Sequence, residues 1–267
     1  MKHLASLSAS YALIMLFTAS ATAQEGNAPP TRYFSIEFMS VDDTQGDAYM
    51  QVEAFWKEIH KARVANGDIQ GWDLWSLSPG GSNQGYQYMT MSYYSDPVTM
   101  MTGGDFGAAF AQAYSDLPQQ EFNEMWSMTG TSRDIAERYY VREIDFIASD
   151  SLVVETGMVA FLDFMKAKPG AGSEYVKAEL DLFRPRHAMQ IEAGGKEFWN
   201  LMSVMVPYGS EVEATHFTAN IFSGWDQVFS TVDVPDPSAN QQTMMQRGMN
   251  LRDHRFTYVA TLIDFVR

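Results

Sequence analysis

The sequence predicts an α+β fold in which two tandem βαββαβ units pack sheet to sheet as one pseudo-symmetric barrel. Matching residues recur along the chain at a nearly constant separation. The hydrophobic pattern also alternates between a period of two and a period of 3.6 residues, in the same order in both copies. The chain has 267 residues, of which 46% are hydrophobic and 19% charged, which is enough to bury a core of this size.

An internal duplication organises the chain. Three residues recur 126 positions later, since Glu37, Tyr49 and Glu53 match Asp163, Tyr175 and Glu179. The separation is 127 between Trp72 and Trp199, 128 between Thr90 and Thr218, and 119 between Arg133 and Arg252. We therefore expect a first repeat over residues 32–148, a linker over 149–156 and a second repeat over 157–267.

The first half of the first repeat predicts a strand, a helix and a hairpin. Residues 33–41 alternate apolar and polar side chains, which is typical of a half-buried strand. Over residues 47–66 the apolar residues follow a helical stripe, and Gly67 stands where a glycine commonly ends a helix. Strands are expected over 72–77 and 86–94, joined by a turn at Pro79-Gly80-Gly81.

The rest of the repeat predicts helices followed by a last strand. Residues 106–114 have a helical pattern, and Pro118 suits the first turn of a helix that runs towards Met128. Residues 142–147 predict the last strand. This order is that of a ferredoxin-like unit. In the second repeat Pro185 lies within the first helical pattern, so that helix should kink or restart there.

Residues 1–23 predict a signal peptide. Lys2 and His3 precede an apolar run over 11–17, and Ala21-Thr22-Ala23 supplies a small-residue cleavage pattern. The apolar run is shorter than a membrane-spanning helix, although an uncleaved anchor is the alternative interpretation. Residues 24–31 then form a linker. We expect a periplasmic or secreted protein with no membrane span.

Composition excludes several classes of function. The net charge of −15 would repel phosphate backbones, so nucleic acid is not an expected partner. Without cysteine, neither disulfides nor cysteine-ligated zinc can form. The chain also lacks the common nucleotide-binding and hydrolase motifs, and its histidines stand far apart, so no metal site is assigned.

With this repeat and topology, the chain resembles the dimeric α/β-barrel superfamily. That superfamily includes antibiotic-biosynthesis-type monooxygenases, stress-responsive barrel proteins and chlorite-dismutase-like haem proteins. The segment over residues 61–75 is also similar to exported bacterial proteins of unassigned function. The resemblance implies a barrel formed by two sheets, but a shared fold does not by itself carry a function.

The first candidate site is the cleft between the first helix and its sheet. At 100° per residue, one arc of this helix carries Tyr49, Glu53, Trp56, His60 and Arg63. We expect His60 to act as a base, Glu53 to orient it and Arg63 to stabilise an anion. Tyr49, Trp56 and Trp72 are the expected walls for an apolar or aromatic ligand, and Tyr88 is a further candidate to line such a pocket. The alternative is that these polar residues simply flank a packed aromatic stripe.

This site is expected in the first repeat. At a separation of 126 the second repeat has Leu182, Arg186 and Met189 in place of Trp56, His60 and Arg63.

The second candidate site lies between the two sheets. Strand parity places four carboxylates opposite the apolar side chains of their strands: Glu37, Asp145, Asp163 and Asp264. We expect Glu37 to face Asp145, and Asp163 to face Asp264, within the interface between the sheets. They could hold calcium or magnesium, share protons, or pair with protein donors.

Three functional hypotheses follow. The first is a small-molecule-binding barrel, acting as a cofactor-independent oxygenase or isomerase on an apolar or aromatic compound. The second is haem binding through His60 or His187, and the third is a non-catalytic interaction protein of the cell envelope. The sequence identifies no cofactor, does not decide whether the protein is an enzyme, and allows a monomer with fused repeats or a homodimer.

Overall fold

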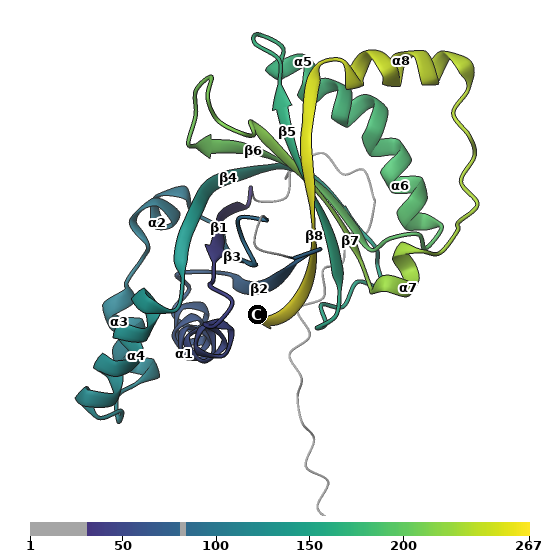
Figure 1. Cartoon of the computed structure of the whole chain (residues 1–267). Coiled ribbons are helices and arrows are strands. Elements are labelled where there is room, and N and C mark those ends of the chain that lie inside the picture. Colours follow the sequence, from purple (N-terminus) through teal and green to yellow (C-terminus); the bar gives the residue numbers. More distant parts are fainter. Residues whose placement is uncertain (1–30, 81–83) are drawn as a thin grey trace, which may run out of the picture.

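The computed structural model describes residues 31–80 and 84–267, and the strands of that part form one closed antiparallel barrel (Figure 1). The predicted signal peptide and Gly81 of the predicted turn lie outside the described residues. Of the predicted linker over residues 24–31, only Thr31 is described. Around the barrel the strand order is β1-β3-β2-β8-β5-β7-β6-β4. The prediction of an α+β barrel is therefore confirmed.

The elements of residues 32–148 agree closely with the sequence patterns. The strands are β1 (Tyr33–Ser40), β2 (Gly71–Ser78), β3 (Tyr88–Tyr94) and β4 (Asp134–Ala148). The helices are α1 (Gly46–Ala65), α2 (Pro97–Thr102), α3 (Phe106–Ala113) and α4 (Gln119–Thr131). There are two differences. The sequence did not predict α2, and β4 begins eight residues before the predicted strand because its first residues pair with the end of β1.

The second half repeats the order of the four strands. Its strands are β5 (Val159–Ala167), β6 (Phe198–Val206), β7 (His216–Phe222) and β8 (Arg252–Val266). Its helices are α5 (Gly172–Ala178), the π-helix η1 (Glu179–Phe183), α6 (Arg184–Glu192), α7 (Trp225–Val228) and α8 (Ala239–Met249). As predicted, the first helix restarts next to Pro185, where α6 begins after η1.

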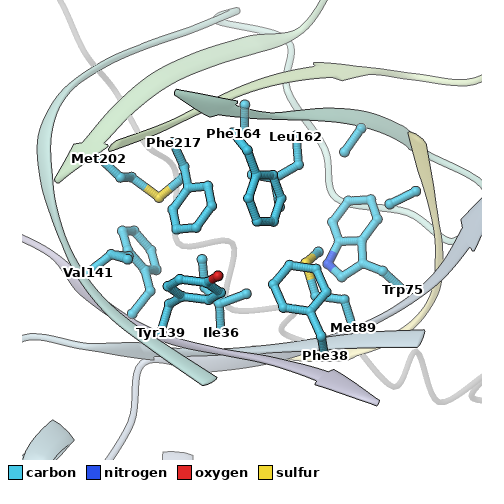
Figure 2. Packing of buried hydrophobic residues seen from close by; sticks show 14 of the residues in the cluster. Ile36, Phe38, Trp75, Met89, Tyr139, Val141, Leu162, Phe164, Met202 and Phe217 are labelled. Atoms are coloured by element: carbon cyan, nitrogen blue, oxygen red, sulfur yellow. The ribbon is translucent and has the colours of Figure 1, made fainter. Parts of the chain in front are cut away.

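The interior of the barrel is an apolar core. Alternate residues of every strand point inwards, and in Figure 2 side chains from opposite walls meet, such as Phe38 and Phe164 with ring centroids 5.6 Å apart. Ile36, Phe164 and Phe217 are all fully buried. Aromatic and branched side chains at native packing density fill such a barrel.

The helices cover the outside of the barrel at opposite places. In Figure 1, α1, α3 and α4 lie on one side, and α5, α6 and α8 lie on the opposite side. None of the helices in the described ranges combines the length and apolar character needed to cross a bilayer.

Hydrogen-bonded strand pairs join the two halves directly, where β2 meets β8 and β4 meets β6. At the second junction Arg32 donates to both oxygens of Glu143, at 2.6 and 2.8 Å, and Asn200 donates to Glu143 at 3.0 Å. The Glu143 side chain is only 5% exposed. A buried carboxylate requires such partners because its desolvation is costly.

We predict that Arg32→Met lowers the free energy of unfolding by about 3 kcal/mol, because it leaves the Glu143 carboxylate buried without its cation. Urea denaturation measures this change. The double variant R32M/E143M should recover most of the loss, since it removes the buried charge as well. A change below about 0.5 kcal/mol in R32M would contradict the role given to this pair.

Candidate functional site

A cavity of about 230 Å³ lies in the second half, between the outer face of the barrel and the helices η1 and α6. Residues from three strands and two helices line it: Asp163, Met165, Glu179, Phe183, His187, Thr218, Asn220, Arg252 and His254. Asp163, Met165 and Thr218 lie on the outer face of the barrel because side chains alternate along a strand and their neighbours Phe164 and Phe217 point into the barrel. The cavity combines two apolar side chains with a dense polar lining.

Asp163 is the most heavily hydrogen-bonded acid of the cavity. Thr257 donates to its Oδ1 at 2.5 Å, and Thr218 donates to its Oδ2 at 3.0 Å. Asn220 also approaches Oδ2, at 3.4 Å, and His254 Nε2 lies 3.3 Å from Oδ1. These donors hold the carboxylate in one orientation and leave it a fixed acceptor at the floor of the cavity.

Glu179 is a buried acid with a weak ionic partner. Its side chain is 4% exposed, and Oε1 lies 3.8 Å from Nε of Arg252. Burial raises the pKa of Glu179 to about 6, although Tyr175 and Arg252 oppose the shift. A carboxyl group with a pKa near neutrality can both accept and return a proton.

Stacking and a hydrogen bond fix the imidazole ring of His187 in the cavity wall. Its ring stacks on Trp199 with centroids 4.9 Å apart, and Nδ1 lies 2.6 Å from Nζ of Lys196. Burial, and then the Lys196 charge, lower the pKa of His187 to about 3, so the imidazole is neutral near pH 7. Lys196 is itself 4% exposed and also donates to Asn220 Oδ1 at 2.6 Å.

The first half contains the same stacked pair. His60 stacks on Trp72 with centroids 5.0 Å apart, and burial lowers the pKa of His60 well below its usual value. His60 therefore corresponds to His187, at a separation of 127, and not to Arg186 as expected from the sequence. The π-helix η1 explains the shift because its wider turn accommodates one additional residue. The expected asymmetry between the repeats at this histidine is wrong.

The structure divides the residues of the first sequence-predicted site into two groups. Glu53 lies beside Tyr49 and 3.3 Å from Nε of Arg133, and burial raises the pKa of Glu53 to about 7. In the described part of the chain Glu53 has no hydrogen bond to His60. The nearest charged group to His60 is Arg63, whose Nη1 lies 3.5 Å from Nδ1.

The other residues of that site are held by packing. Arg63 is 1% exposed, and its guanidinium donates to the Gly103 carbonyl at 2.9 Å. Trp56 turns towards α3 and α4, where its indole donates to Thr129 at 3.2 Å. Trp72 lies beneath His60, and Tyr88 packs on Tyr49 with ring centroids 4.5 Å apart.

The four carboxylates of the second predicted site do not share an interface. They point out of the barrel because apolar side chains fill its interior. The predicted parity is wrong at two of them, because β-bulges beside Asp145 and Asp264 turn Ile144 and Ile263 outwards as well. Glu37 binds Arg138 at 2.6 Å, Asp264 binds Lys57 at 2.5 Å and Asp145 binds Arg184 at 2.5 Å. Pairing with protein donors thus accounts for all four, because the hydroxyl groups described above hold Asp163.

The latter two ion pairs join the halves. Lys57 belongs to α1 and Asp264 to β8, whereas Arg184 belongs to α6 and Asp145 to β4. Each helix therefore contacts the last strand of the other half.

The lining does not fit a haem group. A haem requires a wide, flat and mainly apolar slot beside its axial ligand, whereas this cavity is small and lined by charged and amide groups. Nδ1 of His187 is bound to Lys196, and His60 is 7% exposed against Trp72. Within residues 31–80 and 84–267, no three acidic or histidine side chains are grouped to hold a metal ion.

Sequence reasoning missed Lys196, Arg252 and His254 as residues near a site. The repeat separation changes from 126 at Glu179 to 127 at Trp199. This change is the one sequence signal that the second repeat has an additional residue between these positions, which aligns His187 with His60. Lys196 has no such signal, because a lone lysine in a loop is usually exposed.

Comparisons with known proteins agree with this barrel. No protein-family model and no curated protein matches the sequence. Among solved structures, a monooxygenase-like protein from Fusobacterium nucleatum has a TM-score of 0.51 at 8% identity, over 88% of this chain and 93% of that one. An anthrone oxidase-like protein has a TM-score of 0.50 at 9% identity, over 89% and 93%.

A mutant chlorite dismutase from Candidatus Nitrospira defluvii is similar to the same extent, with a TM-score of 0.51 at 9% identity over 87% of this chain and 92% of that one. Identities this low show the fold and not the activity. The chain therefore shares the barrel fold of these proteins.

Proposed function

We propose that this chain is an exported small-molecule-binding barrel protein whose ligand occupies the cavity beside Glu179 and His187. The observation that carries the proposal is the cavity itself, which has two apolar walls and buried polar groups that converge on one space. Export rests on the signal-peptide pattern of residues 1–23.

We also propose that the two halves are tandem ferredoxin-like units. Residues 32–148 supply the strand order β4-β1-β3-β2, and residues 157–267 supply β8-β5-β7-β6, which is the same relative order. The pairs Tyr49–Glu53 and Tyr175–Glu179 occupy corresponding places under the first helix of each half. The barrel closes within one chain, so its closure does not require a second copy.

The ligand that fits best is a compact apolar or aromatic compound with a polar group. Phe183 and Met165 provide apolar contacts, while Glu179 and Arg252 provide a proton acceptor and a positive charge. A volume of about 230 Å³ is below the usual range for drug-sized ligands, which favours a small compound. Glu179 would act as the general base of a cofactor-independent oxygenase or isomerase.

We expect His187→Ala to release the bound compound and His60→Ala to retain it, because only the first change alters the cavity wall. Native mass spectrometry of the protein purified from a bacterial periplasm measures the retained mass in each variant. Loss in H60A alone would instead support the sequence-predicted site of His60, Glu53 and Arg63. The absence of any retained mass in the wild type and both variants would contradict the proposed function.

The raised pKa of Glu179 predicts a pH dependence of stability. The folded pKa of about 6 exceeds the ordinary value of 4.5, so the folded state holds the proton more tightly than the unfolded chain. Relative to Glu179→Gln, the wild-type free energy of unfolding should therefore fall by about 2 kcal/mol in total as pH rises from well below 4.5 to well above 6.

Urea denaturation at several pH values measures this difference. Glu53→Gln is the matched comparison, because the pKa of Glu53 rises to about 7 and the corresponding fall should continue to that pH. Parallel curves for wild type and E179Q would show that Glu179 is not an acid with a raised pKa.

A further inference from the structure

Lys196 is a buried cation in a place where the first half has an apolar residue. At the separation of 127 that relates the two stacked histidines, Lys196 corresponds to Ile69, which is 2% exposed in its own core cluster. Lys196 is 4% exposed. Burying an ammonium group is costly, so its retention here requires polar partners.

Those partners link Lys196 to the cavity. Its Nζ lies 2.6 Å from Nδ1 of His187 and donates to Oδ1 of Asn220 at 2.6 Å. Asn220 in turn lies within 3.4 Å of Asp163. The loop before β6 is packed closely, since a Cβ at Gly195 would come within 2.7 Å of Val232.

We infer that Lys196 is a positioning residue that keeps the proton of His187 on Nε2, and that the ligand therefore carries a carbonyl or carboxylate oxygen. This inference rests on the proposed function, because it assigns the ligand class of the same cavity. An ammonium group can only donate, so Nδ1 must accept and the neutral ring must carry its proton on Nε2.

The assignment applies to the charged form of Lys196. Burial lowers the pKa of Lys196 to about 7, an effect that Asp163 partly offsets. Below that pH the ammonium form predominates and can only donate to Asn220 and His187, whereas the neutral amine could also accept through its lone pair. His187 and Arg252 both line the cavity, and an imidazole N–H and a guanidinium both suit an oxygen acceptor.

A proton transfer that balances without a co-reactant follows. Glu179 removes a proton from the carbon next to the ligand carbonyl, the C–H electron pair forms a C=C bond, and the carbonyl π pair moves onto oxygen. The N–H of His187 donates to that enolate oxygen. If the ligand has a C=C bond between the second and third carbons from the carbonyl, this enolate is a dienolate. The electron pair on oxygen re-forms the carbonyl, the double bonds shift, and Glu179 returns the proton to the far carbon of the former C=C bond, which completes an isomerisation.

The position of the proton can be read by NMR without a ligand. Long-range ¹H–¹⁵N spectra of histidine-labelled protein at pH 6.5 should show His187 neutral with its proton on Nε2. In Lys196→Ile, which copies the first half, that tautomer should no longer dominate, and Lys196→Arg should preserve it. A proton on Nδ1 in the wild type would overturn the inference, as would an unchanged ring in K196I.

The ligand class is tested with two probes of similar shape. Acetophenone has a carbonyl oxygen and ethylbenzene does not. We expect acetophenone to shift the Nε2–H resonance of His187 saturably, and to bind about tenfold more weakly to K196I. Ethylbenzene should not change the chemical shift of this resonance.

Equal effects of the two probes would overturn the assigned ligand class. These readouts are separate from the retained mass that tests the proposed function. A protein that retains no ligand can still show the expected tautomer, and a protein that retains one can fail the tautomer test.

Discussion

The closed apolar barrel is the constraint on which the rest of the structure depends. Aromatic rings from opposite walls, such as Phe38 and Phe164, fill the middle of its interior. Polar strand residues therefore mostly point outwards, and an inward acid such as Glu137 is held by the tyrosines Tyr86 and Tyr139. The site chemistry therefore lies beneath the helices, where Asp163 and Thr218 meet Glu179 and His187.

Much of this fold could be predicted from the sequence because it is a matter of local pattern. Period-two alternation over residues 33–41 predicts β1, and Pro185 predicts the restart of a helix beside η1. The direction of the strand faces could not be predicted in the same way. Parity separates Glu37 from Phe38 but does not say which of them enters the barrel, because that depends on the curvature of the whole sheet.

The candidate site was less predictable because it depends on one inserted residue. A separation of 126 aligns His60 with Arg186, whereas the π-helix aligns it with His187. Single-turn π-helices of this kind are frequent at functional sites. Lys196 was missed for a different reason, since only the packed loop and the contact with Asn220 show that it is buried.

The two halves therefore share a scaffold but differ in what covers it. Both bury a tyrosine, a glutamate and an arginine beneath the first helix, and both stack a histidine on a tryptophan. In the first half Arg63 lies beside the histidine and is tied to Gly103, and Ile69 is apolar. In the second half the π-helix and Lys196 accompany a cavity. Because a duplicated scaffold preserves stability in one copy, the other copy can hold additional buried polar groups such as Lys196.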